Sequence, residues 1–215
     1  MLLKILSWWP GVLGFLLRQK LYPFFLKQCG HNVLFGRFVT LRGAQHICIG
    51  SGVVINDYAT FDASNYKLPG AGITIENNVF IGGGTKLLSL GEKIIIKQGA
   101  NLGSECRVLA DKKIIIEGEA LFAAYCRIGG THSAHSKSPA PDTSKTIIDQ
   151  QEAQITQIGY GCWLGVRTLF HSGAQIEEGT IIGAHSIVKS RFPQKVVAFG
   201  NPAKIVYHRN DNSIS

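Results

Sequence analysis

Two histidines, His132 and His135, lie three residues apart at the start of a polar stretch that runs from Ser136 to Gln157. Histidine has an ordinary pKa near 6.5, so its side chain is well suited to accept a proton at neutral pH. A lone histidine is more often structural than catalytic. A pair at the base of a long excursion from a compact fold, however, is typical of a functional loop. The pair is therefore a candidate for general-base chemistry.

The elements that would position this pair follow a six-residue period. Between residues 158 and 188 an apolar residue opens each step, and a small or β-branched residue lies four places later. The openers are Ile158, Leu164, Phe170, Ile176, Ile182 and Val188. A helix has a period of about 3.6 residues and a strand a period of about two, so neither produces this pattern. A stack of short coils does, because every sixth residue then faces the interior of a prism.

The same period recurs upstream in four interrupted sets, which open at Ile49, Ile75, Ile96 and Ile116. Three steps make one triangular turn of about 18 residues. The last three openers are 21 and 20 residues apart, so each turn carries two or three extra residues at a corner. We therefore expect a coil domain over 31–207 with a loop excursion at 131–157. An amphipathic helical segment over 1–30 and a flexible tail over 208–215 would flank it.

Two segments, ITIENNVFIGGGTK (73–86) and IGYGCWLGVRTLFHSGAQIEEGTIIGAHSIV (158–188), resemble the coils of the hexapeptide-repeat acyltransferases. The segment VVAFGNPAKIV (196–206) resembles the stretch after the last coil in the sugar and xenobiotic O-acetyltransferase branch. The resemblance covers residues 33–207. It implies an all-β fold, a left-handed parallel β-helix of hexapeptide-repeat coils with a short N-terminal α-helical segment. It also implies a homotrimer that uses acetyl-CoA and no metal.

The resemblance assigns roles around the excursion. In this branch a histidine at the end of a coil is the general base, and it aligns with His132. His135 aligns with a second histidine that binds the acceptor or assists. Glu105 lies at about the place of a polar residue that contacts the acceptor. Backbone N–H groups at a glycine-rich corner could stabilise an oxyanion, and Gly129 and Gly130 are candidates by proximity.

In this family acetyl-CoA lies in a groove between two neighbouring β-helices. Trp163 matches the aromatic residue of the family's VWIG coil, and Lys204 matches the basic position of its closing segment, where a lysine can meet a phosphate. Ordinary groove packing of Trp163 and a solvated Lys204 are the structural alternatives. Three small residues match positions that let the cofactor approach, and Lys189 stands where the family often has Thr or Lys. The small residues are Gly165, Ala184 and Ser186.

The first 56 residues contain six Lys or Arg and no acidic residue, whereas the rest of the chain has sixteen basic and fourteen acidic residues. The apolar run from Ile5 to Leu17 is shorter than the roughly 20 residues that a spanning helix needs. No A-x-A cleavage site follows it, which argues against a signal peptide. A basic segment rich in Leu, Phe and Trp favours a membrane surface over nucleic acid as the partner of residues 1–28.

Within this segment we expect two short helices, one beginning near Pro10 and one near Pro23, with Gly30 as the stop. Trp8, Trp9 and Tyr22 are side chains that favour the headgroup level of a bilayer. The alternative is that these helices pack on the β-helix or on a neighbouring subunit.

Five cysteines occur without a CxxC pair. Cys106, Cys126 and Cys162 fall on the small-residue position of the repeat, where we expect them to be buried hydrophobic side chains. Neither a zinc cluster nor a disulfide framework is favoured by this spacing. A reducing cytoplasm suits such cysteines, so we expect a cytoplasmic protein that is peripheral on the inner membrane.

These observations predict an acetyl-CoA-dependent O-acetyltransferase that acts on a sugar hydroxyl by direct attack, with His132 as the base. The N-terminus suggests a saccharide acceptor held at a membrane, such as a lipid-linked intermediate in bacterial surface polysaccharide biosynthesis. An N-acyltransferase on an amino sugar and a non-enzymatic β-helix scaffold remain alternatives. A zinc hydratase on the same coils would need three histidines that meet between subunits, and that family's spacing is absent.

Overall fold

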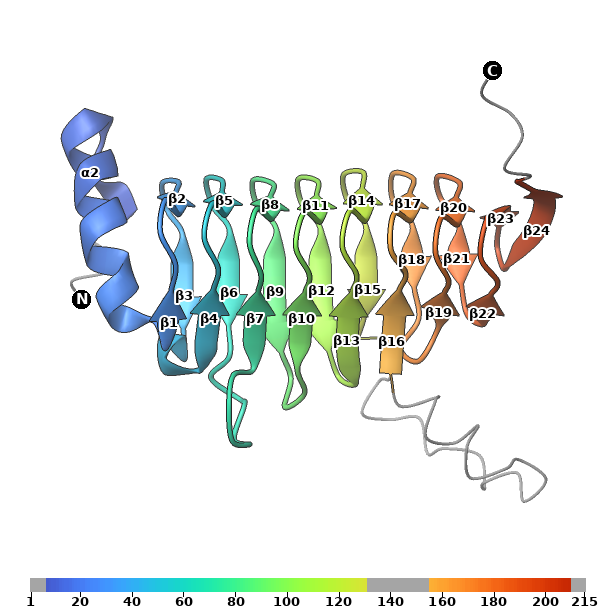
Figure 1. Cartoon of the computed structure of the whole chain (residues 1–215), viewed down its shortest axis with the longest axis horizontal. Helices are drawn as coiled ribbons and strands as arrows, with labels where there is room; N and C mark the ends of the chain where they lie inside the picture. The colour runs from blue at the N-terminus through green and yellow to red at the C-terminus, as the bar shows by residue number, and fades with distance from the viewer. Residues whose placement is uncertain (1–6, 131–154, 210–215) are drawn as a thin grey trace.

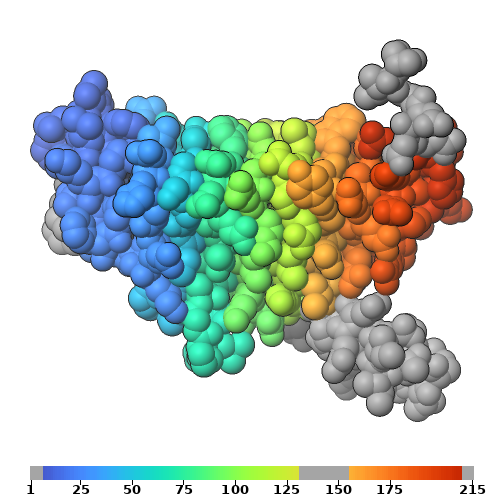
Figure 2. Space-filling model, in the orientation of Figure 1, coloured from blue at the N-terminus to red at the C-terminus, as the bar shows by residue number. Residues whose placement is uncertain are grey.

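The computed structural model describes residues 7–130 and 155–209. In these ranges the chain winds into a left-handed parallel β-helix, which confirms the predicted fold. Each coil contributes one strand to each of three parallel sheets, here called A, B and C. Figure 1 shows the coils stacked along the long axis, with the N-terminal helix across one end and the last strand at the other. Figure 2 shows that successive coils pack side by side along the whole length.

The strands are short and recur in the order A, B, C. Sheet A contains β1 (Gln28–Cys29), β4 (Ile47–Ile49), β7 (Ile73–Ile75), β10 (Ile94–Ile96), β13 (Lys113–Ile116), β16 (Ile155–Ile158), β19 (Gln175–Ile176) and β22 (Arg191–Phe192). Sheet B contains β2 (Leu34–Phe35), β5 (Val54–Ile55), β8 (Phe80–Ile81), β11 (Asn101–Leu102), β14 (Leu121–Phe122), β17 (Trp163–Leu164), β20 (Ile181–Ile182), β23 (Val196–Gly200) and β24 (Ala203–His208). Sheet C contains β3 (Thr40–Arg42), β6 (Thr60–Asp62), β9 (Lys86–Ser89), β12 (Arg107–Ala110), β15 (Arg127–Gly129), β18 (Leu169–Phe170) and β21 (Ile187–Val188).

The repeat openers fill the interior of the prism. In sheet A they pair directly from coil to coil and form a continuous column, in which no side chain is more than 2% exposed. The column is Ile49, Ile75, Ile96, Ile116, Ile158 and Ile176. Full burial of one such side chain contributes about 1.5–3 kcal/mol. The six-residue period of the sequence is therefore the repeat of this column and its counterparts in sheets B and C.

The residue after an opener turns the corner, where the next coil passes very close. At Gly50 an added Cβ would lie 2.7 Å from the backbone carbon of Glu76 and 2.8 Å from the nitrogen of Asn77. Two positions further on, the backbone is left-handed, with φ of +70° at Gly52 and +56° at Asn78. Glycine and asparagine adopt this conformation readily. The Ile-Gly pairs of the sequence thus follow from the spacing between coils.

Extra residues collect at the corner where the chain passes from sheet C to sheet A, which we call the C–A corner. The connections there are residues 63–72, 90–93, 111–112 and 130–154, of which 131–154 lie outside the described residues. The structure thereby confirms the extra corner residues predicted from the spacing of the openers. Strand β16 begins at Ile155, three residues before the repeat resumes at Ile158.

The N-terminal segment closes one end of the prism. Helix α2 (Gly11–Leu21) follows Pro10 as predicted, but the second expected helix is only a single 3₁₀ turn, η1 (Tyr22–Phe25). The expected stop at Gly30 was wrong, because Gln28 and Cys29 already pair with sheet A as β1. The expectation that Tyr22 lies at the headgroup level of a bilayer was wrong, because its side chain is fully buried. It packs edge-on against Phe35, with ring centroids 5.1 Å apart. A further 3₁₀ turn, η2 (Ala44–His46), leads into β4.

The other end is closed by a hairpin. Strand β24 runs antiparallel to β23, after a turn at Asn201-Pro202 with a cis peptide bond. The resembling segment GNPAKIV is therefore the turn and second strand of the cap on sheet B.

The three cysteines expected inside the prism are buried, as predicted. Burial raises the pKa of the Cys162 thiol to about 11. Cys29 and Cys48 are half-buried on sheet A, and all five cysteines are free thiols.

The spacing between coils predicts the effect of Gly50→Ala. The new methyl group would collide with the backbone of the next coil, and overpacking of this kind costs about 1–3 kcal/mol. Urea unfolding followed by circular dichroism would measure the loss. A matched control is Gly161→Asn, because nothing lies within 4 Å of a Cβ there and asparagine accepts its positive φ. Equal stability of the two variants would contradict this account of the Ile-Gly pairs.

Candidate functional site

The polar excursion leaves the prism at a point organised by one carboxylate. Asp111 accepts a hydrogen bond from the Gly130 N–H at 3.1 Å and contacts the Ser172 hydroxyl at 2.6 and 2.8 Å. Asp111, Gly130 and Ser172 occupy the C–A corners of the fourth, fifth and sixth coils, counted from β1. We call this cluster the excursion root. It fixes the direction in which the chain departs toward His132 and His135, both of which lie outside the described residues.

Two left-handed glycines form the last turn before the excursion. Gly129 and Gly130 have φ of +72° and +62°. A Cβ on Gly130 would lie 2.7 Å from Cδ1 of Leu109, so a larger residue is disfavoured by both space and backbone conformation. Arg127 donates a hydrogen bond from Nη2 to the Gly130 carbonyl at 2.9 Å. Because the Gly130 N–H already binds Asp111, it does not point freely at an oxyanion as proximity in the sequence suggested.

Four of the residues matched to acetyl-CoA binding lie on or beside sheet B. Trp163 projects outward from β17 and is 47% exposed. Gly165 and Ala184 lie at the corner between sheets B and C, where a Cβ on Gly165 would approach Cα of Ala184 to 2.8 Å. Gly165 is therefore required for the stacking of coils as well. Lys204 is exposed on β24, the last strand of the same sheet.

The other two residues lie elsewhere. Ser186 is fully buried, and its hydroxyl accepts a hydrogen bond from the Gly200 N–H at 3.1 Å. Its side chain therefore holds the C-terminal hairpin to the coils and offers nothing to a ligand on the surface. Lys189 is exposed at the C–A corner after β21, on the same corner as the excursion root.

Glu105 stands at the corner between sheets B and C in the fourth coil, with φ of +57°. It lines a shallow cavity of about 410 Å³. The other lining residues are Phe38, Thr40, Tyr58, Thr60, Gly84 and Lys86. Phe38 and Tyr58 stack there with ring centroids 4.9 Å apart. Sheet C separates this cavity from the excursion root, so within one chain Glu105 does not lie beside Gly130, the last described residue before the excursion.

The same separation applies to the cofactor-matched residues other than Lys189, which lies at the C–A corner. Strands β15 and β18 cross sheet C from the corner near Gly165 to the corner that holds the excursion root. Trp163 and the root therefore lie beyond opposite edges of sheet C. Within one chain the excursion root and the exposed face of Trp163 therefore face different directions.

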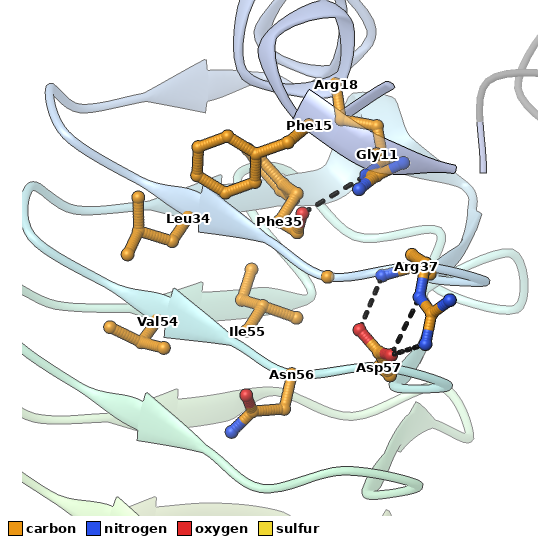
Figure 3. Close-up of a pocket in the computed structure, with 11 residues that line it drawn as sticks. Gly11, Phe15, Arg18, Leu34, Phe35, Arg37, Val54, Ile55, Asn56 and Asp57 are labelled. Atoms are coloured by element: carbon orange, nitrogen blue, oxygen red, sulfur yellow. Dashed lines mark hydrogen bonds and ion pairs between the residues drawn. The ribbon is translucent and has the colours of Figure 1, made fainter. Parts of the chain in front are cut away.

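A second hollow lies at the N-terminal end, between α2 and the first two coils of sheet B (Figure 3). Its volume is about 390 Å³. Phe15 from the helix faces the column of Leu34 and Val54, and the Arg37–Asp57 ion pair, 3.1 Å long, lies at the opposite side. None of the predicted site residues lines this hollow, and the third coil lies between it and Asp111, the nearest residue of the excursion root along the stack.

An apolar stripe on sheet B was missed by the sequence analysis. Its outward side chains pair from coil to coil along the prism and are half-buried or exposed. We call these residues the sheet B stripe: Leu34, Val54, Phe80, Asn101, Leu121, Trp163, Ile181 and Val197. The available signal was the apolar doublet at each sheet B opener, such as Leu121-Phe122, in which the first residue faces outward.

Comparison with known proteins identifies the family. No protein-family profile matches the chain. WcaF of Escherichia coli, named as a colanic acid biosynthesis acetyltransferase, is 40% identical over 128 residues, which cover 52% of this chain and 70% of WcaF. The chain belongs to the hexapeptide-repeat acetyltransferases. This membership makes it an acyl-transfer enzyme and disfavours the non-enzymatic scaffold.

The chain is also similar to a second relative and to a solved structure. WbbJ of Escherichia coli, named as a lipopolysaccharide biosynthesis O-acetyl transferase, is 25% identical over 142 residues, or 64% of this chain and 72% of WbbJ. The crystal structure of AntD, an N-acyltransferase from Bacillus cereus in complex with dTDP and 3-hydroxybutyryl-CoA, has a TM-score of 0.55. It covers 91% of this chain and 90% of AntD at 17% identity, so it supports the fold alone. Among residues 7–130 and 155–209, no three His, Cys, Asp or Glu side chains are grouped to hold a metal ion.

The excursion root predicts the effect of Asp111→Ala. The substitution leaves the Gly130 N–H and the Ser172 hydroxyl without this half-buried acceptor, which costs about 1–3 kcal/mol. Urea unfolding would measure the loss. Glu178→Ala, an exposed carboxylate on the A–B side of the prism, is the matched control and is expected to change stability by less than about 0.5 kcal/mol. An Asp111→Ala variant as stable as the control would show that the root does not hold the corner.

Proposed function

We propose that this enzyme transfers an acetyl group from acetyl-CoA to a sugar hydroxyl, in active sites shared between the copies of a homotrimer. One observation carries the shared site: the excursion root and the Trp163 surface lie beyond opposite edges of sheet C. A second copy that places its sheet B beside the C–A corner of the first would join the two halves. Three copies arranged in a ring satisfy this contact for every subunit.

The sheet B stripe supports such an assembly. It runs along the length of the prism, so copies joined through it lie side by side with their N-terminal ends at the same level. Outward apolar side chains on nearly every coil, interrupted only by Asn101, form the kind of extended patch that marks an interaction surface. Trp163 belongs to this stripe and would line the edge of the contact.

Different residues of this chain have different roles in the transfer. Bound acetyl-CoA supplies an activated acyl group. His132 accepts the proton of the acceptor hydroxyl as its oxygen attacks the thioester carbonyl. The C–S bond then breaks, and the proton passes from His132 to the departing CoA sulfur. Asp111 fixes the chain two residues upstream of His132. Trp163 offers an exposed ring for the cofactor next to the corner formed by Gly165 and Ala184, and Lys204 and Lys189 offer cations for its phosphates. His135 and Glu105 are the proposed contacts to the acceptor.

The named activities of relatives support a saccharide acceptor in surface polysaccharide biosynthesis. WcaF and WbbJ are named for the biosynthesis of colanic acid and lipopolysaccharide. The alternative, N-acylation of an amino sugar, draws on the fold shared with AntD. Mass spectrometry of the product before and after mild alkali separates the two, because an ester is cleaved and an amide persists.

We further propose that the N-terminal end of the prism docks on a membrane, so that the enzyme is cytoplasmic and peripheral on the inner membrane. Within the described residues, no helix combines the length and apolar character that spanning a bilayer requires. Helix α2 and its flanks nevertheless expose large apolar side chains beside two lysines. We call this surface the end face: Trp8, Val12, Leu13, Leu16, Lys20, Phe24 and Lys27. The absence of acidic residues before Asp57 suits an anionic lipid surface.

A subunit-mixing experiment tests the shared site. His132→Ala removes the base, and the rate should fall about 10²- to 10⁴-fold. Trp163→Ala should raise the KM for acetyl-CoA and abolish turnover at low donor concentration. Coexpressed in equal amounts, the two variants should form mixed trimers that each contain one intact site, which restores about a quarter of wild-type activity. Acetylation of free sugars, found by an acceptor screen with the wild type, provides the readout.

The control is coexpression of His132→Ala with a double variant that carries both substitutions, which can form no intact site. Activity from the mixed single variants that does not exceed this control would place each site within one chain. Full activity of His132→Ala alone would remove His132 from the mechanism.

Membrane docking predicts the behaviour of the double variant Leu13→Glu/Leu16→Glu. Both side chains are more than half exposed, so the fold should persist while apolar area at the end face is replaced by charge. Binding to phosphatidylglycerol vesicles, measured by flotation, should weaken at least about tenfold. The matched control is Leu68→Glu/Leu90→Glu, which changes two equally exposed leucines on loops at the C–A corner. Equal flotation of the two variants, or no flotation of the wild type, would overturn membrane docking.

A further inference from the structure

The end face is rigidly attached to the coils. Arg18 of α2 is only 3% exposed, and its Nε donates a hydrogen bond to the carbonyl of Phe35 in β2 at 3.2 Å. Its Nη1 donates to the Trp9 carbonyl at 2.9 Å, so the same guanidinium also holds the chain before the helix. The buried Tyr22 then packs on Phe35. A helix held by such contacts cannot swing like a tethered arm, and its position relative to every coil is fixed.

The helix lies across the end of the prism, roughly at right angles to the stacking axis (Figure 1). Its inner side is formed by Gly14 and Arg18, which are buried, and by Leu17 and Leu21, which pack on the core. Its outer side presents Val12 and Leu16, which are 76% and 51% exposed. A bilayer that receives the outer side therefore lies against the end of the prism, and the stacking axis points away from it.

Strand spacing then sets the height of the excursion root. Adjacent strands in a sheet are about 4.8 Å apart, so the fifth coil lies about 19 Å from the first. The helix, packed on the first coil by one side and exposed on the other, adds about 10 Å, its diameter, between the first coil and the lipid. The ladders of all three sheets are continuous from coil to coil, so this height cannot be adjusted by bending.

We propose that the acceptor is a saccharide anchored to a membrane lipid and that the modified sugar lies several rings away from the lipid end. A single pyranose ring attached to a lipid phosphate would remain beside the end face. Asp111, Gly130 and Trp163 lie farther from the membrane surface than one sugar ring can reach, so only a chain of several sugars brings its outer ring to them. The prism thus selects an anchored oligosaccharide by its length. This inference rests on the proposed function, since it takes the transfer site to be at the root and the end face to be on the membrane.

The height is tested first, with fluorescence energy transfer on vesicles of phosphatidylcholine and phosphatidylglycerol that carry a headgroup acceptor dye. Donor dyes are placed on His31→Cys or Tyr160→Cys, after Cys29 and Cys48 are changed to serine. These two residues occupy equivalent places on the corner between sheets A and B, in the first and sixth coils, so they differ only in height. Transfer should be strong from residue 31 and weak from residue 160. Equal transfer would mean that the prism lies flat, and would overturn the proposal.

A coil duplication provides the matched control for height. Ile94 of β10 pairs with Ile73 of β7, so residues 73–93 form one structural repeat. Duplicating this repeat should increase the distance between residue 160 and the membrane by one coil spacing and leave the distance between residue 31 and the membrane unchanged. Energy transfer should decrease only for the upper dye.

The length dependence is tested with synthetic glycolipids in the same vesicles. Each carries, at its outer end, a sugar that the wild-type enzyme acetylates in free form, separated from the lipid by none to five hexoses. We expect at least about tenfold faster transfer to the long than to the short glycolipids, since misplacement of the acceptor is costly. The coil duplication should shift the threshold to longer glycolipids.

Free sugars of all lengths should react alike, which separates the two proposals. If glycolipids of every length also react alike, length selection fails while the proposed function stands. If no free sugar or glycolipid is acetylated by the wild-type enzyme, the proposed function fails and the length selection fails with it.

Discussion

Coils stacked at the spacing of one β-strand leave almost no room between them, and the rest of this molecule follows from that limit. A single methyl group at Gly50 would meet the backbone of the next coil below 3 Å. Additional chain can therefore leave the stack only at corners, and nearly all of it leaves at the C–A corner. The excursion that carries His132 begins there because a corner is the one place where a long polar segment does not force the coils apart.

The sequence predicted what depends on local repetition. Openers six residues apart predicted the interior columns, and openers 20 or 21 residues apart predicted the extra residues at a corner. The buried positions of Cys106, Cys126 and Cys162 followed from the same register. Each of these features depends on a contact that is repeated between successive coils, so the residue pattern that predicts it occurs many times in one sequence. The start of α2 after Pro10 was also predictable, because proline sets the backbone angle of a first helical turn.

The features that the sequence did not predict depend on contacts that occur only once in the structure and are not repeated from coil to coil. Gln28 and Cys29 form a strand only because β4 lies beside them, and nothing in their types signals it. Ser186 matched a position next to the cofactor, yet its hydroxyl binds the Gly200 N–H inside the cap. Motif matching could not show that Trp163 and the excursion root flank opposite edges of sheet C. That relation follows from the wrapping of the chain around three sheets, and it is the basis of the proposed site shared between copies.

The two end caps have a consequence for how the protein behaves in bulk. A repeat fold has open β edges at both ends, and such edges template further strands, which leads to fibres. At one end of sheet B, Arg18 occupies the Phe35 carbonyl that a foreign strand would seek. At the other, β24 runs against the direction of every earlier strand, so a following coil has no parallel partner on which to continue. The same stacking that gives the prism its stiffness is thus prevented from propagating into head-to-tail polymers.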